Sequence, residues 1–142
     1  MNTRDYILNV ALLLCGATHF CILFASALTP KVMGWKKELS VLPRLLQQLF
    51  WVYGSFIVLS IVAIGVLTLL HANAMAEGDS VARSVAAFAA VFWGARLMVQ
   101  FFVFDARPYL TNGWLKLGYN MLTVAFIFLV LTYSTAALQL HR

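Results

Sequence analysis

The residue with the clearest capacity for chemistry in this chain is Arg96, a permanent positive charge inside an apolar segment that spans residues 84–104. The five acidic residues all lie at the ends of apolar segments: Asp5, Glu38, Glu77, Asp79 and Asp105. Asp105, the nearest along the chain, is nine residues away, or about 13 Å along a helix. A lone arginine in hydrocarbon costs at least ~3 kcal/mol. Polar neighbours, water, a lipid headgroup, a ligand or another protein must therefore stabilise Arg96.

Polar side chains from the other apolar segments fall at the same depth as Arg96. His19 lies nine residues before the end of the first segment, and Arg96 lies eight residues before the corresponding end of the third. Polar residues in membrane spans usually face the helix bundle or a wet cavity. We therefore expect a ligand site with polar groups and apolar walls, formed by His19, Arg96, Gln100, Asn120, Gln47, Trp93, Trp51 and Phe92.

The same polar residues also have a purely structural interpretation. Hydrogen bonds between membrane helices contribute ~0.6 kcal/mol on average, and the amides of Gln100, Asn120 and Gln47 need do no more than that. A histidine in mid-span, such as His19, is more often a structural hydrogen-bonding group than a ligand. For Arg96 a binding role is favoured, because deprotonation cannot remove its charge.

Several kinds of catalytic and metal site are not expected. The spans offer Cys15 and His19 on one helical face and no carboxylate, whereas zinc sites need three or four ligands. His71 and His141 end two spans on the other side and lack a third ligand. Haem is disfavoured, since only His19 is in mid-span. Without paired carboxylates, a nucleophile elbow or a phosphate loop, the sequence favours a non-catalytic function.

The elements that must position these residues are transmembrane helices. The chain of 142 residues is 63% hydrophobic and only 11% charged, against about 25% charged in soluble domains. Four apolar segments, at about 6–28, 49–70, 84–104 and 117–139, are long enough to cross a bilayer. Short connections favour antiparallel neighbours. The prediction is one all-α transmembrane domain over residues 1–142, an up-down-up-down four-helix bundle.

Local signals place the ends of the helices. Pro30 is expected to stop the first helix, and Pro43 suits the first turn of the second. The first loop, with Trp35 and leucines on one face and lysines elsewhere, predicts a short amphipathic stretch on the membrane surface. An anionic-lipid or calmodulin-type site there is the less favoured alternative. Gly78 should break the chain before the third helix, which Asp79 or Ser80 can cap.

The third segment is expected to pack on two sides. One face carries Arg96, and the opposite face carries the small residues Ala87, Ala90 and Gly94. Small residues allow membrane helices to approach closely, so Gly94 is predicted to contact another helix.

Basic residues are distributed unequally between the predicted loops. The first and third loops hold Lys31, Lys36, Lys37, Arg44, Arg107 and Lys116, whereas the opposite side holds Arg4, Arg83 and Arg142. This bias predicts a bacterial-type inner membrane protein with both termini outside. Because the basic residues are dispersed over loops, nucleic acid is not expected as a partner.

Three functions remain open at the level of sequence. The leading hypothesis is a small membrane protein whose polar pocket, in the cytoplasmic half, binds a quinone-like or lipid amphiphile. The first alternative is an accessory or anchor subunit of a larger membrane complex, or a homo-oligomer, with Arg96 paired to a partner. The second is a membrane enzyme or haem electron carrier that uses His19.

Overall fold

A computed structural model describes residues 2–103 and 111–138, and this part of the chain is helical apart from its turns and ends. The elements are α1 (Thr3–Val32), α2 (Trp35–Leu39), α3 (Arg44–Glu77), α4 (Ser80–Phe102) and α5 (Gly113–Ala137). Asp105, Arg107, His141 and Arg142 lie outside the described residues.

Four of these helices, α1, α3, α4 and α5, are long and apolar enough to cross a membrane. Each contains one of the four apolar segments almost completely and extends past at least one of its ends, as α3 does at both ends of 49–70. The apolar residues thus predict the existence and number of the helices correctly within the described residues. On this composition and length the chain is an integral membrane protein.

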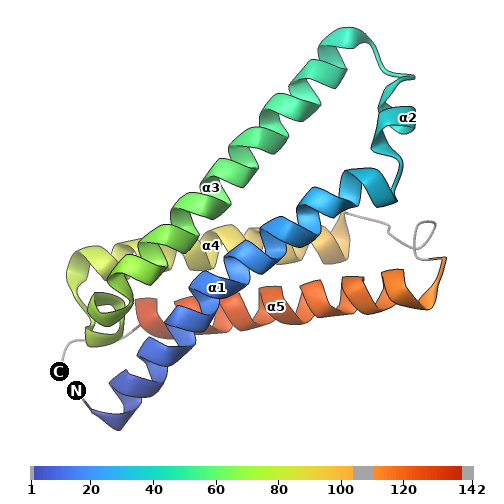
Figure 1. Ribbon diagram of the computed structural model, residues 1–142. Helices are drawn as coiled ribbons and strands as arrows, with labels where there is room; N and C mark the ends of the chain where they lie inside the picture. The colour runs from blue at the N-terminus through green and yellow to red at the C-terminus, as the bar shows by residue number, and fades with distance from the viewer. Residues whose placement is uncertain (1, 104–110, 139–142) are drawn as a thin grey trace.

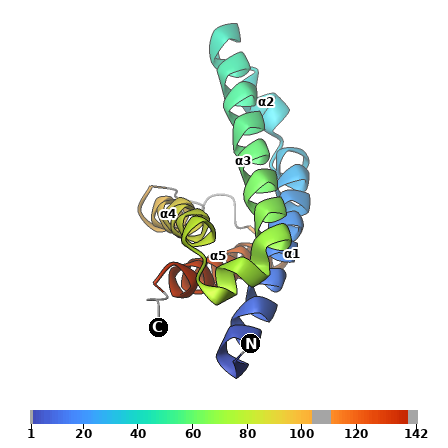
Figure 2. The same cartoon turned by 90° about the vertical axis from the view of Figure 1, so that its left-hand side faces the viewer.

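The long helices form two antiparallel hairpins, α1 with α3 and α4 with α5 (Figure 1). Packing within each hairpin is extensive, whereas α1 meets α5, and α3 meets α4, over shorter stretches. In the view of Figure 2, α4 and α5 are seen nearly end-on beside the upright α1 and α3. The hairpins therefore cross steeply near the turn between α3 and α4 and diverge toward the end that carries α2 (Figure 1). This arrangement differs from a bundle of four helices aligned along their whole length.

The helix ends follow the local chemistry with one exception. Gly78 adopts a left-handed conformation (φ 83°) after α3, and the carboxylate of Asp79 accepts hydrogen bonds from the backbone N–H groups of Val81 and Ala82. The prediction that Pro30 ends α1 is wrong, since the helix continues to Val32. A proline in the last turn removes a single backbone hydrogen bond, which a helix can tolerate.

Only one face of α4 is well buried. Ala82, Ala86, Ala89 and Trp93 are buried, whereas Ala87 on the opposite side is exposed. Ala90 is half-buried and packs against the core at the edge of the buried face. The expectation that α4 also packs through its opposite face is wrong for Ala87 and Gly94. A Cβ placed on Gly94 would meet no atom within 4 Å, so Gly94 does not mediate a close helix contact.

The close approach occurs instead between α1 and α3. A Cβ placed on Gly16 would lie 2.5 Å from the Leu69 side chain, and one on Gly65 would lie 3.0 Å from Cβ of His19. The contact at Gly16 is with a leucine side chain, whereas the contact at Gly65 is with Cβ of His19 and leaves little room for a larger residue. Small residues at this crossing let two backbones pack directly, as is typical of membrane helices, and the contact fixes the position of His19.

Candidate functional site

Hydrogen bonds between the hairpins include two in the described residues to which each long helix contributes one residue. We call His19 of α1, Thr68 of α3, Trp93 of α4 and Tyr133 of α5 the crossing cluster. His19 and Thr68 are 0% exposed, and Trp93 is 1% exposed. The indole Nε1–H of Trp93 donates to Nε2 of His19 over 2.9 Å, and the Tyr133 and Thr68 hydroxyls lie 2.6 Å apart.

The geometry assigns the hydrogens in this cluster. Because Nε2 of His19 accepts, a neutral imidazole must carry its hydrogen on Nδ1, which lies 2.7 Å from the Cys15 carbonyl oxygen and donates to it. The Thr68 hydroxyl donates to the Ile64 carbonyl oxygen over 2.8 Å, so the Tyr133 hydroxyl is the donor toward Thr68. Both ring nitrogens of His19 are therefore occupied inside the protein.

Aromatic contacts connect the two hydrogen-bonded pairs. The His19 ring meets the Trp93 ring edge-on at 5.1 Å between centroids and the Tyr133 ring at 6.0 Å. On its other side, Trp93 stacks on Phe126 of α5 at 5.3 Å. Such edge and offset-stacked geometries are favourable for aromatic rings. The crossing cluster thus fixes the angle between the hairpins and leaves its polar groups satisfied.

Arg96 lies beside this cluster, between α4 and α5. Its guanidinium carbon is 5.3 Å from the centroid of the Phe126 ring, which is within the range of a cation–π interaction. The side chain is half-buried, as expected for an arginine that does not simply face lipid. Phe126 therefore contributes to stabilising the charge that the sequence leaves far from any acid.

Gln100 lies further along α4 and is held by hydrogen bonds to α5. Its amide nitrogen donates to the Thr123 hydroxyl oxygen over 2.5 Å, and the Thr123 hydroxyl donates to the Tyr119 carbonyl oxygen over 3.0 Å. Gln100 is 4% exposed. It lies seven residues beyond Trp93, or about 10 Å along the helix. These bonds join α4 to α5 within one hairpin, which is the structural role considered for this amide.

The structure separates the remaining predicted site residues. Gln47 donates to the Leu42 carbonyl oxygen at the start of its own helix, and Trp51 is exposed with its ring edge-on to Phe50. Phe92 is half-buried and contacts the Trp93 ring at 5.2 Å. No contact within the described residues ties Gln47 or Trp51 to the crossing cluster. Matched depth along four helices does not bring side chains together when the hairpins diverge.

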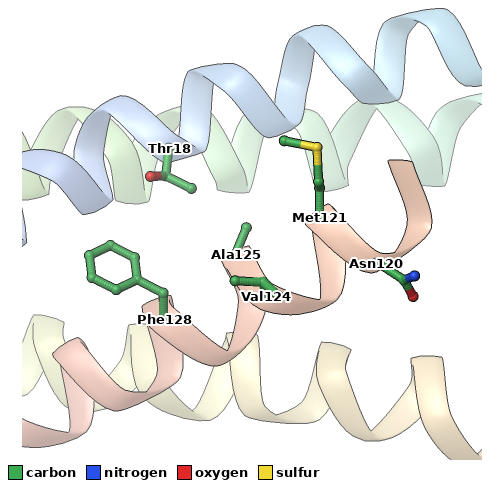
Figure 3. A pocket seen from close by; sticks show the side chains of 6 residues that line it. All are labelled: Thr18, Asn120, Met121, Val124, Ala125 and Phe128. Atoms are coloured by element: carbon green, nitrogen blue, oxygen red, sulfur yellow. The ribbon is translucent and has the colours of Figure 1, made fainter. Parts of the chain in front are cut away.

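Asn120 lies at a separate place, an open groove between α1 and α5. The groove has a volume of about 370 Å³ and is lined by Thr18, Asn120, Met121, Val124, Ala125 and Phe128. Figure 3 shows Met121 and Ala125 directed from α5 toward α1 with Phe128 beside them, whereas the Asn120 amide, at the end of the row, is directed away from α1. At 100° per residue these positions surround the face of α5 opposite Phe126. The groove and Arg96 therefore occupy different sides of α5.

A second groove of about 410 Å³ lies between α3 and α4, lined by residues that include Ile64, Leu67 and Phe88. Its two serines, Ser60 and Ser84, donate to backbone carbonyl oxygens of their own helices. In the α1/α5 groove Thr18 does the same, but the Asn120 amide makes no hydrogen bond within the described residues. Asn120 thus distinguishes the two grooves chemically.

Comparison with known proteins does not identify the chain: no family model, curated protein or solved structure matches it.

Sequence reasoning did not anticipate Thr68 and Tyr133. Both carry hydroxyls inside apolar segments, a pattern that often indicates only local bonding to the helix backbone. Among the described residues no three histidines, cysteines, aspartates or glutamates come close enough to hold a metal ion. Cys15 is buried and Cys21 is exposed, and both are free.

Proposed function

We propose that this membrane protein binds a long-chain amphiphile with a neutral carbonyl headgroup, of the quinone class, in the α1/α5 groove. The observation that carries the proposal is the composition of the groove: apolar walls with one amide at the end, that of Asn120, which bonds to no other described residue. An amide can donate to a quinone carbonyl, while Val124, Ala125 and Phe128 offer a surface for an apolar tail. Pockets for small ligands combine apolar walls with few polar groups in this way.

The charge of the groove favours a quinone over a phospholipid headgroup. None of the six lining residues is charged. A phosphate group is usually met by lysine, arginine or a set of backbone N–H groups, and Arg96 contacts Phe126 on the other side of α5. The proposal therefore reassigns the predicted pocket: Asn120 belongs to it, and His19, Gln100 and Arg96 hold the helices that form it.

The two other functions receive less support from the geometry. A haem or acid–base role for His19 would require Nε2 to give up its bond to Trp93. A partner acid at Arg96 would have to reach a guanidinium that is half-buried against Phe126. No comparable rearrangement is needed for a ligand to enter the open α1/α5 groove.

Filling the groove should abolish binding. Val124 in the groove is 65% exposed, and Val91, on α4 and outside both grooves, is 71% exposed. Val124→Trp places a bulky ring in the groove, whereas Val91→Trp changes a surface that faces away from it. We expect a decyl-benzoquinone, added at 100 times its Kd, to stabilise the wild type and Val91→Trp by about 2.7 kcal/mol in a thermal unfolding experiment, and Val124→Trp hardly at all.

Two further arms of this experiment separate the ligand classes. Asn120→Leu should weaken decyl-benzoquinone binding about fivefold, the effect of one hydrogen bond. Dioleoylphosphatidylcholine in place of the quinone should give no shift. Equal quinone shifts in Val124→Trp and Val91→Trp would overturn the proposed site, and a shift with the phospholipid alone would replace the quinone with a lipid.

We also propose that the protein resides in a bacterial inner membrane with both ends of the chain outside. The unequal distribution of basic residues between the loops supports this orientation. In the fold, Lys36 and Lys37 of α2 and Lys116 near the start of α5 lie at the diverging end of the hairpins, whereas Arg4 and Arg83 lie at the other (Figure 1).

Labelling of introduced cysteines tests the orientation. Lys37 lies in α2, before the start of α3, and Glu77 is the last residue of α3; both are exposed. Ala76, next to Glu77, is buried and therefore unsuitable for labelling. In a Cys21→Ser background, a membrane-impermeant maleimide should label Glu77→Cys in intact cells and Lys37→Cys only after permeabilisation. Labelling of Lys37→Cys in intact cells would reverse the orientation.

A further inference from the structure

The connection between α1 and α3 carries basic residues that the amphiphile groove does not use. Lys31 lies in the last turn of α1, Lys36 and Lys37 lie in α2, and Arg44 begins α3. All four side chains are exposed. Glu38 is the one acidic residue in this stretch of the sequence. We call these four basic residues the basic surface.

The geometry of α2 turns its lysines outward. Gly34, in the left-handed conformation (φ 64°), ends the path of α1 and starts α2 in a new direction. Trp35 and Leu39, one turn apart, are half-buried, whereas Lys36 and Lys37 between them are exposed. The Trp35 ring meets the Phe50 ring of α3 edge-on at 5.1 Å. This contact attaches α2 to the beginning of α3.

The surroundings of the basic surface match the chemistry of a membrane interface. Tryptophan is enriched at headgroup depth, and Trp35 lies beside the lysines. Leu45, Leu46 and Leu49, in the first turns of α3, are exposed. A lipid bound here could place its headgroup against Lys36 and Lys37 and its acyl chains along these leucines.

We propose that the basic surface is a binding site for the headgroups of anionic phospholipids. Four positive charges against one negative charge favour a phosphate-bearing headgroup with net negative charge over a zwitterionic one. Basic residues close to a membrane surface attract anionic lipids in proportion to their number. The site would enrich anionic lipid around the α1/α3 hairpin, independently of any ligand in the α1/α5 groove.

The test compares lipid selectivity in two variants with the same net charge. The protein is reconstituted in phosphatidylcholine vesicles, and the association of spin-labelled phosphatidylglycerol relative to spin-labelled phosphatidylcholine is measured by electron paramagnetic resonance. Lys36→Gln/Lys37→Gln removes two charges from the basic surface. Arg4→Gln/Lys116→Gln removes two exposed charges elsewhere and is the matched control.

The wild type should prefer phosphatidylglycerol. In Lys36→Gln/Lys37→Gln this preference should fall at least about fivefold, because each basic residue near the surface changes the affinity for anionic lipid by about this factor. The control variant should retain it, and ~1 M salt should remove it by shortening the Debye length to about 3 Å. Since all four substituted side chains are exposed, both variants should unfold like the wild type in neutral detergent.

An unchanged preference in Lys36→Gln/Lys37→Gln would overturn the proposal. These lysines would then contact water or an acidic protein instead of lipid headgroups. Equal losses in the two double variants would also overturn it, since the preference would then follow net charge alone.

Discussion

Replacing Trp93 with alanine is expected to lower the free energy of unfolding by about 3–5 kcal/mol, as for other buried aromatic residues. Trp93 is 1% exposed and lies at the centre of the crossing cluster, where it stacks on Phe126 and donates to His19. Truncation leaves a cavity and a buried acceptor without its donor. Unfolding in mixed micelles of denaturing and neutral detergent, followed by circular dichroism, measures the loss.

A smaller substitution isolates the hydrogen bond. Trp93→Phe keeps most of the ring volume, and in a double-mutant cycle with His19→Leu the coupling should reach about 0.6–1.7 kcal/mol, the range found for bonds between membrane helices. Asn9 lies ten residues before His19 on α1 and bonds to Asn73 of α3. The pair Trp93 and Asn9 is the control and should show no coupling. A coupling of zero between Trp93 and His19 would mean that the bond does not hold the hairpins together.

Enlarging Gly65 is expected to be the second most damaging change. Its Cβ would lie 3.0 Å from Cβ of His19, a position that is itself fixed by the backbone of α1. Gly65→Leu must therefore separate α1 from α3 or displace His19 from Trp93. Overpacking of this kind costs about 1–3 kcal/mol, measured by the same unfolding experiment.

Two other glycines provide matched controls. Gly54 lies on the same helix and Gly94 on α4, and a Cβ placed on either of them would meet no atom within 4 Å. Gly54→Leu and Gly94→Leu should leave stability unchanged or raise it slightly, since leucine forms helices better than glycine. If Gly65→Leu proved as harmless as these two, the close contact between α1 and α3 would not contribute to the fold.

The helices were predictable from sequence because a bilayer imposes a simple requirement on them. An apolar run of about 20 residues in hydrocarbon must form a helix to satisfy its backbone. Signals at the ends, such as Gly78 and Asp79, act locally and were interpreted correctly. The prediction at Pro30 failed because a proline in the last turn of a helix costs little free energy.

The packing was less predictable, since it depends on which helix pairs with which. Span lengths and depths do not encode the steep crossing of the hairpins, so Gln47 and Trp51 were grouped with residues they do not contact. Gly94 and Gly65 look alike in sequence, yet only Gly65 faces a neighbouring helix. His19, Trp93 and Gln100 are buried, as expected for polar or aromatic residues that face the interior of a bundle, but their partners emerged only from the fold.

Photolabelling tests the central proposal, the binding of a quinone-like amphiphile between α1 and α5, most directly. A benzoquinone with an azide on its alkyl tail would be irradiated with the protein in vesicles, and the labelled residues identified by mass spectrometry of peptides. The proposal predicts labels on Thr18 and on Met121, Val124 and Phe128, competed by unlabelled decyl-benzoquinone and absent in Val124→Trp. Labels confined to the α3/α4 groove, or spread over the exposed surface without competition, would contradict it.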